Sequence, residues 1–228
     1  FMHHSTLKEL TTYPLFEEVS AERLAHLNLK PSDRTYEPGQ VSVAREDLGR
    51  DVYFLRACRV LAVYWTEDGR ELIFGRIEPG AYFGEMAALD NATRSLSIYA
   101  HRKTEVIALT QADFLKLINE IPEIRHHVFR DHVARIRQMI DSNSQLASHS
   151  VAMRDRAYLV RTALEAGVLV EEGEIRDPPT HLEIANSVGS NREAVSRVMA
   201  ELKRSGLIDS GRRHIRLLRP TELVEQVV

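Results

Sequence analysis

Three charged side chains near the C-terminus have the chemistry and spacing to read DNA bases. Arg192, Glu193 and Arg197 fall on one side of a predicted helix, within about one and a half turns of one another. An arginine can donate two parallel hydrogen bonds to O6 and N7 of guanine, and a glutamate can accept one from N4 of cytosine. The alternative is a solvated helix face on which Glu193 only completes a capping box with Ser190. We favour base reading, because the surrounding segments predict the elements that such a face needs.

Residues 180–208 predict two short helices joined by a tight turn. Caps and a left-handed turn residue stand at the required places: Thr180 with Glu183, then Gly189, then Ser190 or Asn191. The second helix has an apolar side at the spacing of a buried stripe, formed by Ala194, Val195, Val198, Met199 and Leu202. This is the pattern of a helix-turn-helix whose second helix enters the DNA major groove. Further DNA contacts are expected from Thr180, Asn191 and Ser196.

The next segment predicts a hairpin with a basic tip. Alternating apolar residues at 207–210 and 214–218 flank Gly211, Arg212 and Arg213. The two arginines would meet phosphate, as the wing of a winged helix does. Residues 181–219 carry eight arginines and lysines against four acidic residues, whereas the whole chain has a formal net charge of −3. A local basic face of this kind is typical of a DNA-binding surface.

A second group of reactive side chains surrounds a glycine turn in the N-terminal half. Gly84 is followed by Glu85, Met86 and Ala87, and the pair Arg94-Ser95 comes nine residues after the glutamate. Free backbone amides at the turn and a guanidinium can hold one phosphate, while the carboxylate accepts from sugar hydroxyls. The segment therefore predicts a site for a sugar phosphate.

The elements around this turn predict a β-rich domain. From 34 to 109 the chain has short apolar runs broken by glycines, and Asp68-Gly69 between two of them indicates a hairpin. Many short strands at this spacing are typical of a sandwich or jelly roll. A short helix is expected before them, at about 20–29. Cys58, the single cysteine, is expected to be a small buried residue in a strand.

A long helix is predicted to follow, from Pro122 to about His149. Every third or fourth residue lies on one seam, in a coiled-coil spacing: Phe129, His132, Ile136, Met139, Asn143 and Leu146. Two copies of the chain could pair along this seam, or the helix could pack only on its own domain. A regulator that reads a palindrome needs a dimer, so we favour pairing. Ser150 is the expected cap of the next helix, at 153–166.

The bulk composition is that of an ordinary globular protein of two modest domains. The chain has 228 residues, of which 43% are hydrophobic and 28% charged. No apolar run approaches the roughly 20 residues of a membrane span, and no signal-peptide pattern is present. We expect a cytoplasmic protein with no membrane partner. We also expect no metal site and no enzyme, because the sequence has no zinc spacing, catalytic triad or P-loop.

The order of these features resembles the CRP/FNR family of bacterial transcription regulators, from about Tyr13 to Leu218. The resemblance implies an α+β fold, with an N-terminal jelly roll (cyclic-nucleotide-binding domain) at 1–121, a dimerisation helix at 122–149 and a C-terminal winged helix-turn-helix at 150–228. It implies double-stranded DNA, a second copy and RNA polymerase as partners, the last through a candidate surface at 167–179. Alternatives are a regulator with no nucleotide or another effector (a dinucleotide or haem), and a regulatory subunit of an enzyme.

The resemblance also assigns roles within the two groups. The FGE…RS segment resembles the cyclic-nucleotide cassette, so Glu85 would bind the ribose 2′-hydroxyl and Arg94 and Ser95 the cyclic phosphate, with Gly84 supplying the turn. Arg135 of the long helix would reach the same glutamate. Arg192 and Arg197 would read guanines, and Glu193 a cytosine, of a TGTGA-like half-site.

Two positions depart from the family pattern at the base of the nucleotide. Met139 and Ile140 stand where the catabolite activator has paired hydroxyl residues against the adenine. A purine could instead stack on these apolar side chains, and Ser142 or Asn143 could supply polar contacts one turn further on. We therefore expect a cyclic mononucleotide, cAMP in preference to cGMP.

Overall fold

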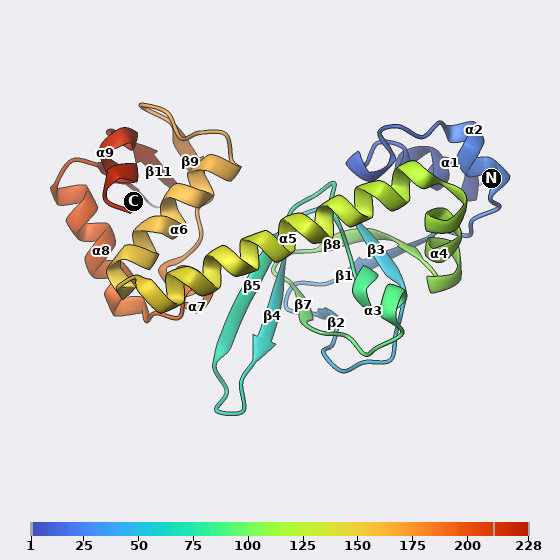
Figure 1. Ribbon diagram of the computed structural model, residues 1–228, viewed down its shortest axis with the longest axis horizontal. Coiled ribbons are helices and arrows are strands. Elements are labelled where there is room, and N and C mark those ends of the chain that lie inside the picture. The colour runs from blue at the N-terminus through green and yellow to red at the C-terminus, as the bar shows by residue number, and fades with distance from the viewer. Residues whose placement is uncertain (1, 212, 228) are drawn as a thin grey trace. The chain divides into compact units, whose positions relative to one another are not determined.

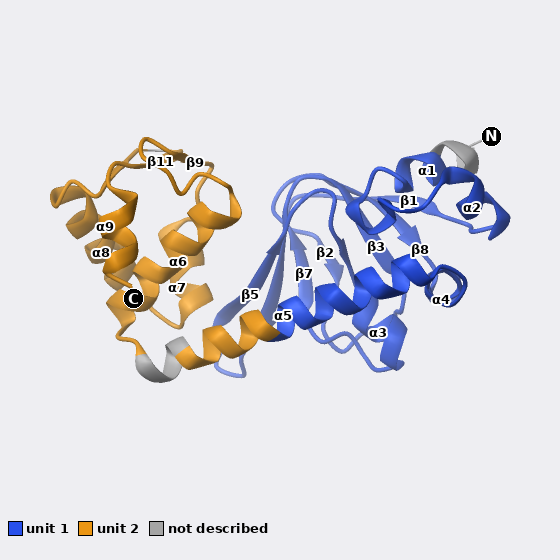
Figure 2. Cartoon of the chain, turned by 45° about the horizontal axis from the view of Figure 1, so that its top comes forward, with its two compact units in different colours: residues 1–136 blue, residues 137–228 orange. Residues whose placement is uncertain are grey.

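The computed structural model describes residues 2–211 and 213–227 and divides into two compact units. Residues 1–136 form unit 1 and residues 137–228 form unit 2 (Figure 2). Strands dominate unit 1, and helices with a small sheet make up unit 2 (Figure 1). The predicted α+β class is confirmed. The finer division at 121 and 149 stays a prediction.

Unit 1 is the predicted jelly roll. It has two antiparallel four-stranded sheets, in the order β1-β8-β3-β6 and β2-β7-β4-β5 (Figure 1). The strands of the first sheet are β1 (Ser32–Tyr36), β8 (Thr104–Leu109), β3 (Val52–Ala57) and β6 (Tyr82–Phe83). Those of the second are β2 (Val41–Val43), β7 (Ser97–Ala100), β4 (Val60–Trp65) and β5 (Glu71–Ile77). Residues 84–95 follow β6, at the edge of the first sheet, and lead to β7 of the second sheet.

Two turns of unit 1 test local predictions. The hairpin at Asp68-Gly69 joins β4 to β5, and Gly69 has φ +80°, a conformation in which glycine carries no steric cost. The prediction for Cys58 is wrong. Cys58 lies in the turn between β3 and β4 with φ 62° and is only half-buried, because the chain reverses there between two strongly apolar strands.

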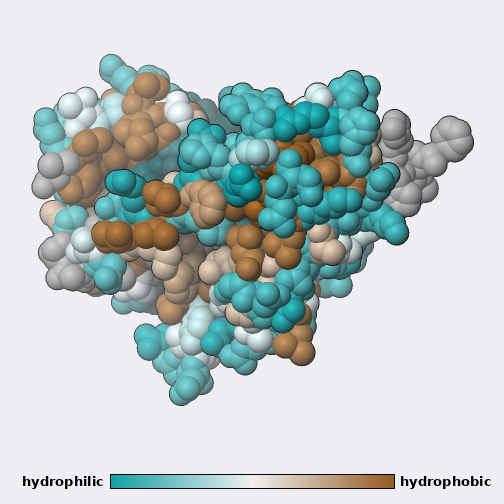
Figure 3. Space-filling view, turned by 45° about the vertical axis from the view of Figure 1, so that its right-hand side comes forward, coloured by the Kyte–Doolittle hydropathy of each residue, from teal (hydrophilic) through white to brown (hydrophobic). Residues whose placement is uncertain are grey.

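The long helix α5 runs from Pro122 to Ser148, close to its predicted limits, and α6 (Val151–Glu165) follows after the cap at Ser150. Its predicted seam is largely uncovered in the single chain. Phe129 is 64% exposed, Ile136 57% and Met139 61%, and the neighbouring Val133 and Ile140 are also exposed. Figure 3 shows several places where hydrophobic residues reach the surface of the face that it draws. The side chain of Leu146 lies outside the described residues.

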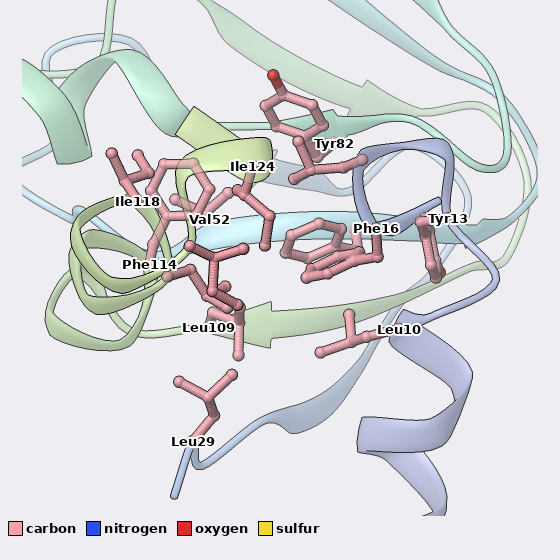
Figure 4. Close-up of a cluster of buried hydrophobic side chains, with 14 of the residues drawn as sticks. Leu10, Tyr13, Phe16, Leu29, Val52, Tyr82, Leu109, Phe114, Ile118 and Ile124 are labelled. Atoms are coloured by element: carbon pink, nitrogen blue, oxygen red, sulfur yellow. The ribbon is translucent and has the colours of Figure 1, made fainter. Parts of the chain in front are cut away.

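Short helices pack beside the first sheet and complete the core of unit 1. These are α1 (Met2–Leu10), the 3-10 turn η1 (Pro14–Phe16), α2 (Ala21–His26) and α4 (Gln111–Glu120). Phe54 of β3 lies at the centre, with ring centroids 5.4 Å from Tyr13 and 5.5 Å from Phe16. Figure 4 shows Leu10, Phe16, Leu109 and Phe114 gathered in this cluster. Helix α2 was predicted, but α1 and η1 were not.

Unit 2 is the predicted winged helix-turn-helix. Its helices are α6, α7 (His181–Val188), α8 (Arg192–Arg204) and α9 (Pro220–Glu225). The predicted hairpin is present as β10 (Ile208–Ser210) and β11 (His214–Leu217). A third strand, β9 (Glu174–Arg176), pairs with β11 and was not predicted, since three residues are too few to show an alternating pattern.

A carboxylate is buried in unit 2. Asp155 of α6 is 4% exposed, and neither of its oxygens has a hydrogen-bond partner among the residues that the structure describes. Burial raises the pKa of Asp155 to about 6, against the opposing effects of the Ser190 hydroxyl and the Arg154 charge. The folded carboxyl thus holds its proton more tightly than the unfolded one. Ionisation at neutral pH therefore destabilises unit 2.

We predict that Asp155→Asn stabilises unit 2 at pH 7.5 and not at pH 3.5. In the wild type the free energy of unfolding should fall by about 1–2 kcal/mol as the pH rises from about 4 to 6. It should stay at the lower value above pH 6. Asparagine has nearly the shape of the protonated acid and no charge to bury. Amide hydrogen exchange of α6 and α7, measured across this range, checks the prediction. A wild-type stability as flat with pH as that of the variant would contradict it.

Candidate nucleotide and DNA sites

A left-handed glycine turn forms the centre of the first site. Strand β6 ends at Phe83, and Gly84 then caps α3 (Glu85–Asp90) with φ 86°. A Cβ atom at Gly84 would lie 2.7 Å from Nη1 of Arg94 and 2.9 Å from the carbonyl oxygen of Asp51. Both the dihedral angle and the space require glycine here. Helix α3 is a single short helix within what the sequence predicted only as a loop.

Arg94 is buried beside this turn and has no acidic partner among the described residues. Its side chain is 4% exposed, and it donates from Nη1 to the carbonyl of Gly84 and from Nη2 to that of Asp51, each at 2.7 Å. Its Nε is buried and unbonded, and no carboxylate of the described chain forms an ion pair with it. Taking a positive charge out of water is costly unless a negative charge approaches it. The arrangement is therefore suited to an anion.

Backbone contacts fix the position of Arg94. Its amide donates to the carbonyl of Asp47 at 3.0 Å, and its carbonyl accepts from the amide of Glu46 at 2.9 Å. The guanidinium carbon lies 5.7 Å from the ring centroid of Tyr53, within cation–π range. The loop after α3 is thus tied to the loop before β3, which holds the guanidinium against the glycine turn.

Glu85 is the second buried charge of the site. It is 2% exposed, and its Oε1 accepts from Nη1 of Arg135 at 2.5 Å. Arg135 lies on α5, and its guanidinium carbon is 5.9 Å from the ring centroid of Tyr82. Glu85 therefore joins α3 to the long helix through a charge-assisted hydrogen bond.

Tyr82 ties the same part of α5 to the sheet. Its hydroxyl donates to Oδ2 of Asp131 at 2.8 Å. Burial, and then the Asp131 charge, raise the pKa of this phenol, so that it stays a hydrogen-bond donor at physiological pH. This bond helps to hold Arg135 at the level of Glu85.

The structure brings together some of the predicted nucleotide contacts and not others. Gly84, Glu85, Arg94 and Arg135 are linked by the contacts above. Ser95 is exposed next to Arg94, Met86 is 49% exposed and Ala87 is buried at 3%. The remaining predicted contacts lie exposed on the part of α5 that belongs to unit 2, and their role stays a prediction: Met139, Ile140 and Asn143.

The predicted caps of the helix-turn-helix are present. Thr180 and Glu183 form a reciprocal capping box at α7, and Gly189 ends that helix with φ 63°. Asn191, rather than Ser190, caps α8 by accepting from the amide of Ala194 at 2.8 Å. Glu193 is thus not the partner of Ser190 in a capping box, and this alternative for its role is wrong.

The two faces of α8 differ as expected. Val195, Val198, Met199 and Leu202 are buried, whereas Ala194 is half-buried. Arg192, Glu193 and Arg197 are exposed, and none has an ion pair or hydrogen bond to another described residue. These three charged groups are free to bind a ligand outside the protein.

Sequence reasoning missed His181, which lies beside this face. Its Nδ1 is 2.8 Å from the hydroxyl of Ser196, a predicted DNA contact. Burial, and then the nearby charge of Arg192, lower the pKa of His181, so that the ring is neutral at physiological pH. In the wing, Arg213 is exposed, and Arg212 lies outside the described residues.

Residues 2–211 and 213–227 contain neither a membrane-spanning helix nor a metal site. No helix there is long and apolar enough to span a membrane. In the same ranges, no group of three or more histidine, cysteine, aspartate or glutamate side chains is arranged to hold a metal ion.

Comparison with known proteins assigns a class to each unit. Residues 33–120 match the family described as "Cyclic nucleotide-binding domain", and residues 156–226 match "Crp-like helix-turn-helix domain". The chain is 31% identical over 198 residues to the "Cyclic AMP receptor protein" of Thermus thermophilus, covering 87% of this chain and 89% of that protein. The chain belongs to the CRP/FNR family. It is a DNA-binding transcription regulator with a cyclic nucleotide-binding domain.

Solved structures agree with this assignment. FixK2 from Bradyrhizobium japonicum superposes with a TM-score of 0.74 at 21% identity, covering 88% of this chain and 98% of that one, which shows the fold. The catabolite activator protein of Thermus thermophilus is 28% identical with a TM-score of 0.53, covering 94% and 98%.

We predict that Gly84→Ala destabilises unit 1 by more than about 1 kcal/mol and weakens nucleotide binding, because the new methyl group meets Arg94. Urea unfolding followed by the fluorescence of Trp65, the single tryptophan, measures the stability of unit 1. Gly69→Ala is the matched control, since Gly69 has a similar φ and open space around it. Equal effects of the two substitutions on binding would contradict this account.

Proposed function

We propose that the protein is a homodimeric regulator whose affinity for operator DNA is set by a cyclic mononucleotide. The observation that carries this proposal is the buried guanidinium of Arg94, which has no acidic partner in the described chain and lies against a glycine turn. A cyclic phosphate diester bears one negative charge and would compensate it. The site of action is the cytoplasm, where DNA and RNA polymerase are available.

The residues around Arg94 offer groups that would bind the rest of the ligand. Glu85 would accept from the ribose 2′-hydroxyl in addition to the bond that Arg135 donates to its Oε1, and Ser95 would add a bond to the phosphate. Relatives over most of the chain length are named for cAMP, which supports cAMP before cGMP. Met139, Ile140 and Asn143 would contact the base.

The exposed seam of α5 supports pairing of two copies. Phe129, Val133, Ile136, Met139 and Ile140 are each at least half exposed in the single chain. Apolar side chains at this spacing gain free energy when a second helix covers them. Asn143 on the same helix would fix the register of the pair.

The exposed face of α8 supports reading of a TGTGA-like palindrome. Arg192 and Arg197 would pair with guanines and Glu193 with a cytosine, while Thr180, Asn191, Ser196 and the wing arginines Arg212 and Arg213 would contact the DNA around them. In a dimer, two such helices about 34 Å apart would enter successive major grooves.

Nucleotide and DNA would act on each other through the dimer. The ligand touches Glu85, and Glu85 holds α5, so ligand binding can favour one arrangement of the seam. The shift cannot exceed the difference in affinity of the ligand for the two arrangements. By thermodynamic reciprocity, operator DNA must tighten nucleotide binding by the same factor.

We predict that Arg94→Leu abolishes measurable cyclic nucleotide binding and leaves non-specific DNA affinity unchanged, because Arg94 belongs to unit 1 and the basic face to unit 2. Titration calorimetry with cAMP and cGMP, and anisotropy with random duplex DNA, measure the two affinities. Arg23→Leu is the control, since it also removes one arginine, from an exposed ion pair with Glu123. Normal nucleotide affinity of the Arg94 variant would exclude this pocket.

We predict that Arg192→Ala costs about 1–3 kcal/mol on the cognate palindrome and relaxes selection at one base pair. Arg204→Ala, at the other end of the exposed side of α8, is the matched control and should weaken all sequences slightly and equally. Mobility shifts on single-base variants of the palindrome separate the two effects. If Arg192→Ala leaves the preference among these variants intact, the face does not read bases.

A further inference from the structure

A histidine on α5, His132, lies beside Glu85. His132 lies one helical turn before Arg135, and its Nε2 is 3.8 Å from Oε1 of Glu85. That nitrogen is buried and has no hydrogen-bond partner among the described residues. The other ring nitrogen, Nδ1, lies 3.0 Å from the carbonyl oxygen of Val128. Buried polar atoms are nearly always bonded, so Nε2 calls for a partner.

The chemistry of the two neighbours fixes the protons of the ring. The carbonyl of Val128 can only accept, so Nδ1 carries a hydrogen and donates to it. In the neutral ring Nε2 then has only a lone pair, and it would face the carboxylate of Glu85, which is also an acceptor. At 3.8 Å the two atoms are too far apart for a direct bond. If Nε2 also carries a hydrogen, a group between the two atoms can accept from Nε2–H and donate to Glu85.

A hydroxyl satisfies both requirements, since it has one hydrogen to donate and lone pairs to accept. We propose, on the basis of the function proposed above, that His132 is a ligand-binding residue that hydrogen-bonds to the same sugar hydroxyl as Glu85. The hydroxyl hydrogen goes to Oε1 of Glu85, and the hydroxyl oxygen accepts from Nε2–H of His132. The second ring hydrogen is a proton taken up from solvent, so an imidazolium stands beside the buried carboxylate, and Arg135 donates to the same Oε1.

Other titratable groups near this part of α5 are engaged elsewhere. Asp131 accepts from the hydroxyl of Tyr82 at 2.8 Å and lies 3.7 Å from Nε2 of His127. Within the described chain, Glu85 is the acidic side chain that lies within 4.0 Å of the His132 ring. The His132 ring therefore has Glu85 as its acidic neighbour, and Arg135 donates to the same carboxylate.

The test compares a 3′,5′-cyclic nucleotide with its 2′-deoxy analogue, in the full-length protein. His132→Phe should lower the affinity for cAMP about tenfold and leave that for 2′-deoxy-cAMP unchanged, because the analogue has no hydroxyl for His132 to bind. His132→Gln keeps a donor in the same place and should retain most of the affinity. Sedimentation and circular dichroism of each variant check assembly and folding, since His132 also lies on the predicted seam.

The comparison with the 2′-deoxy analogue is the readout that a packing role of His132 would not move. If His132→Phe lowers the affinities for cAMP and for its analogue equally, or lowers neither, the role of His132 is overturned. Binding that depends on Arg94 would still stand in either case. A wild type that binds neither cAMP nor cGMP would overturn the proposed function itself.

Discussion

The nucleotide site depends on the buried positive charge of Arg94, which forms no ion pair with a carboxylate of the described residues. Arg94 is 4% exposed, and its donors reach only the backbone carbonyls of Gly84 and Asp51 among the described residues. Carbonyl dipoles compensate a charge only in part, so the site is suited to an anion that completes the pairing. Gly84 has to be a glycine so that the turn and this guanidinium can approach each other. The jelly roll holds these two parts of the chain together.

A second buried charge links the nucleotide site to the long helix. Glu85 starts the short helix after the glycine turn, and Arg135 of α5 donates to it at 2.5 Å. A ligand that binds Glu85 therefore acts on a residue of α5, the helix whose apolar seam is exposed.

In unit 2, helix caps fix the recognition face. The capping box at Thr180 and the cap at Asn191 orient α7 and α8, while Arg192 and Arg197 have no partners in the described chain. Both the nucleotide site and the recognition helix thus hold arginines without an acidic partner in the described chain on a backbone fixed by turns or caps.

Local signals in the sequence predicted much of this architecture. The caps at Ser150, Thr180 and Asn191, the glycine turn at Gly69 and the apolar stripe of α8 depend on nearby residues alone, so spacing is enough to find them. Tertiary contacts explain what was missed. Strand β9 forms because β11 offers it an edge, and Cys58 takes a left-handed turn because two strands reverse there. The burial of Arg94, and the approach of His132 to Glu85 and of His181 to Ser196, join residues far apart in the chain and leave no local pattern.

The most direct test of the central claim is titration calorimetry of cAMP into the wild-type protein, alone and bound to a palindromic operator. If occupancy of the Arg94–Glu85 pocket sets operator affinity, nucleotide binds more tightly to the DNA complex. The factor must equal the one by which nucleotide tightens DNA binding, which anisotropy measures independently. Nucleotide affinity that is the same with and without operator would contradict the account.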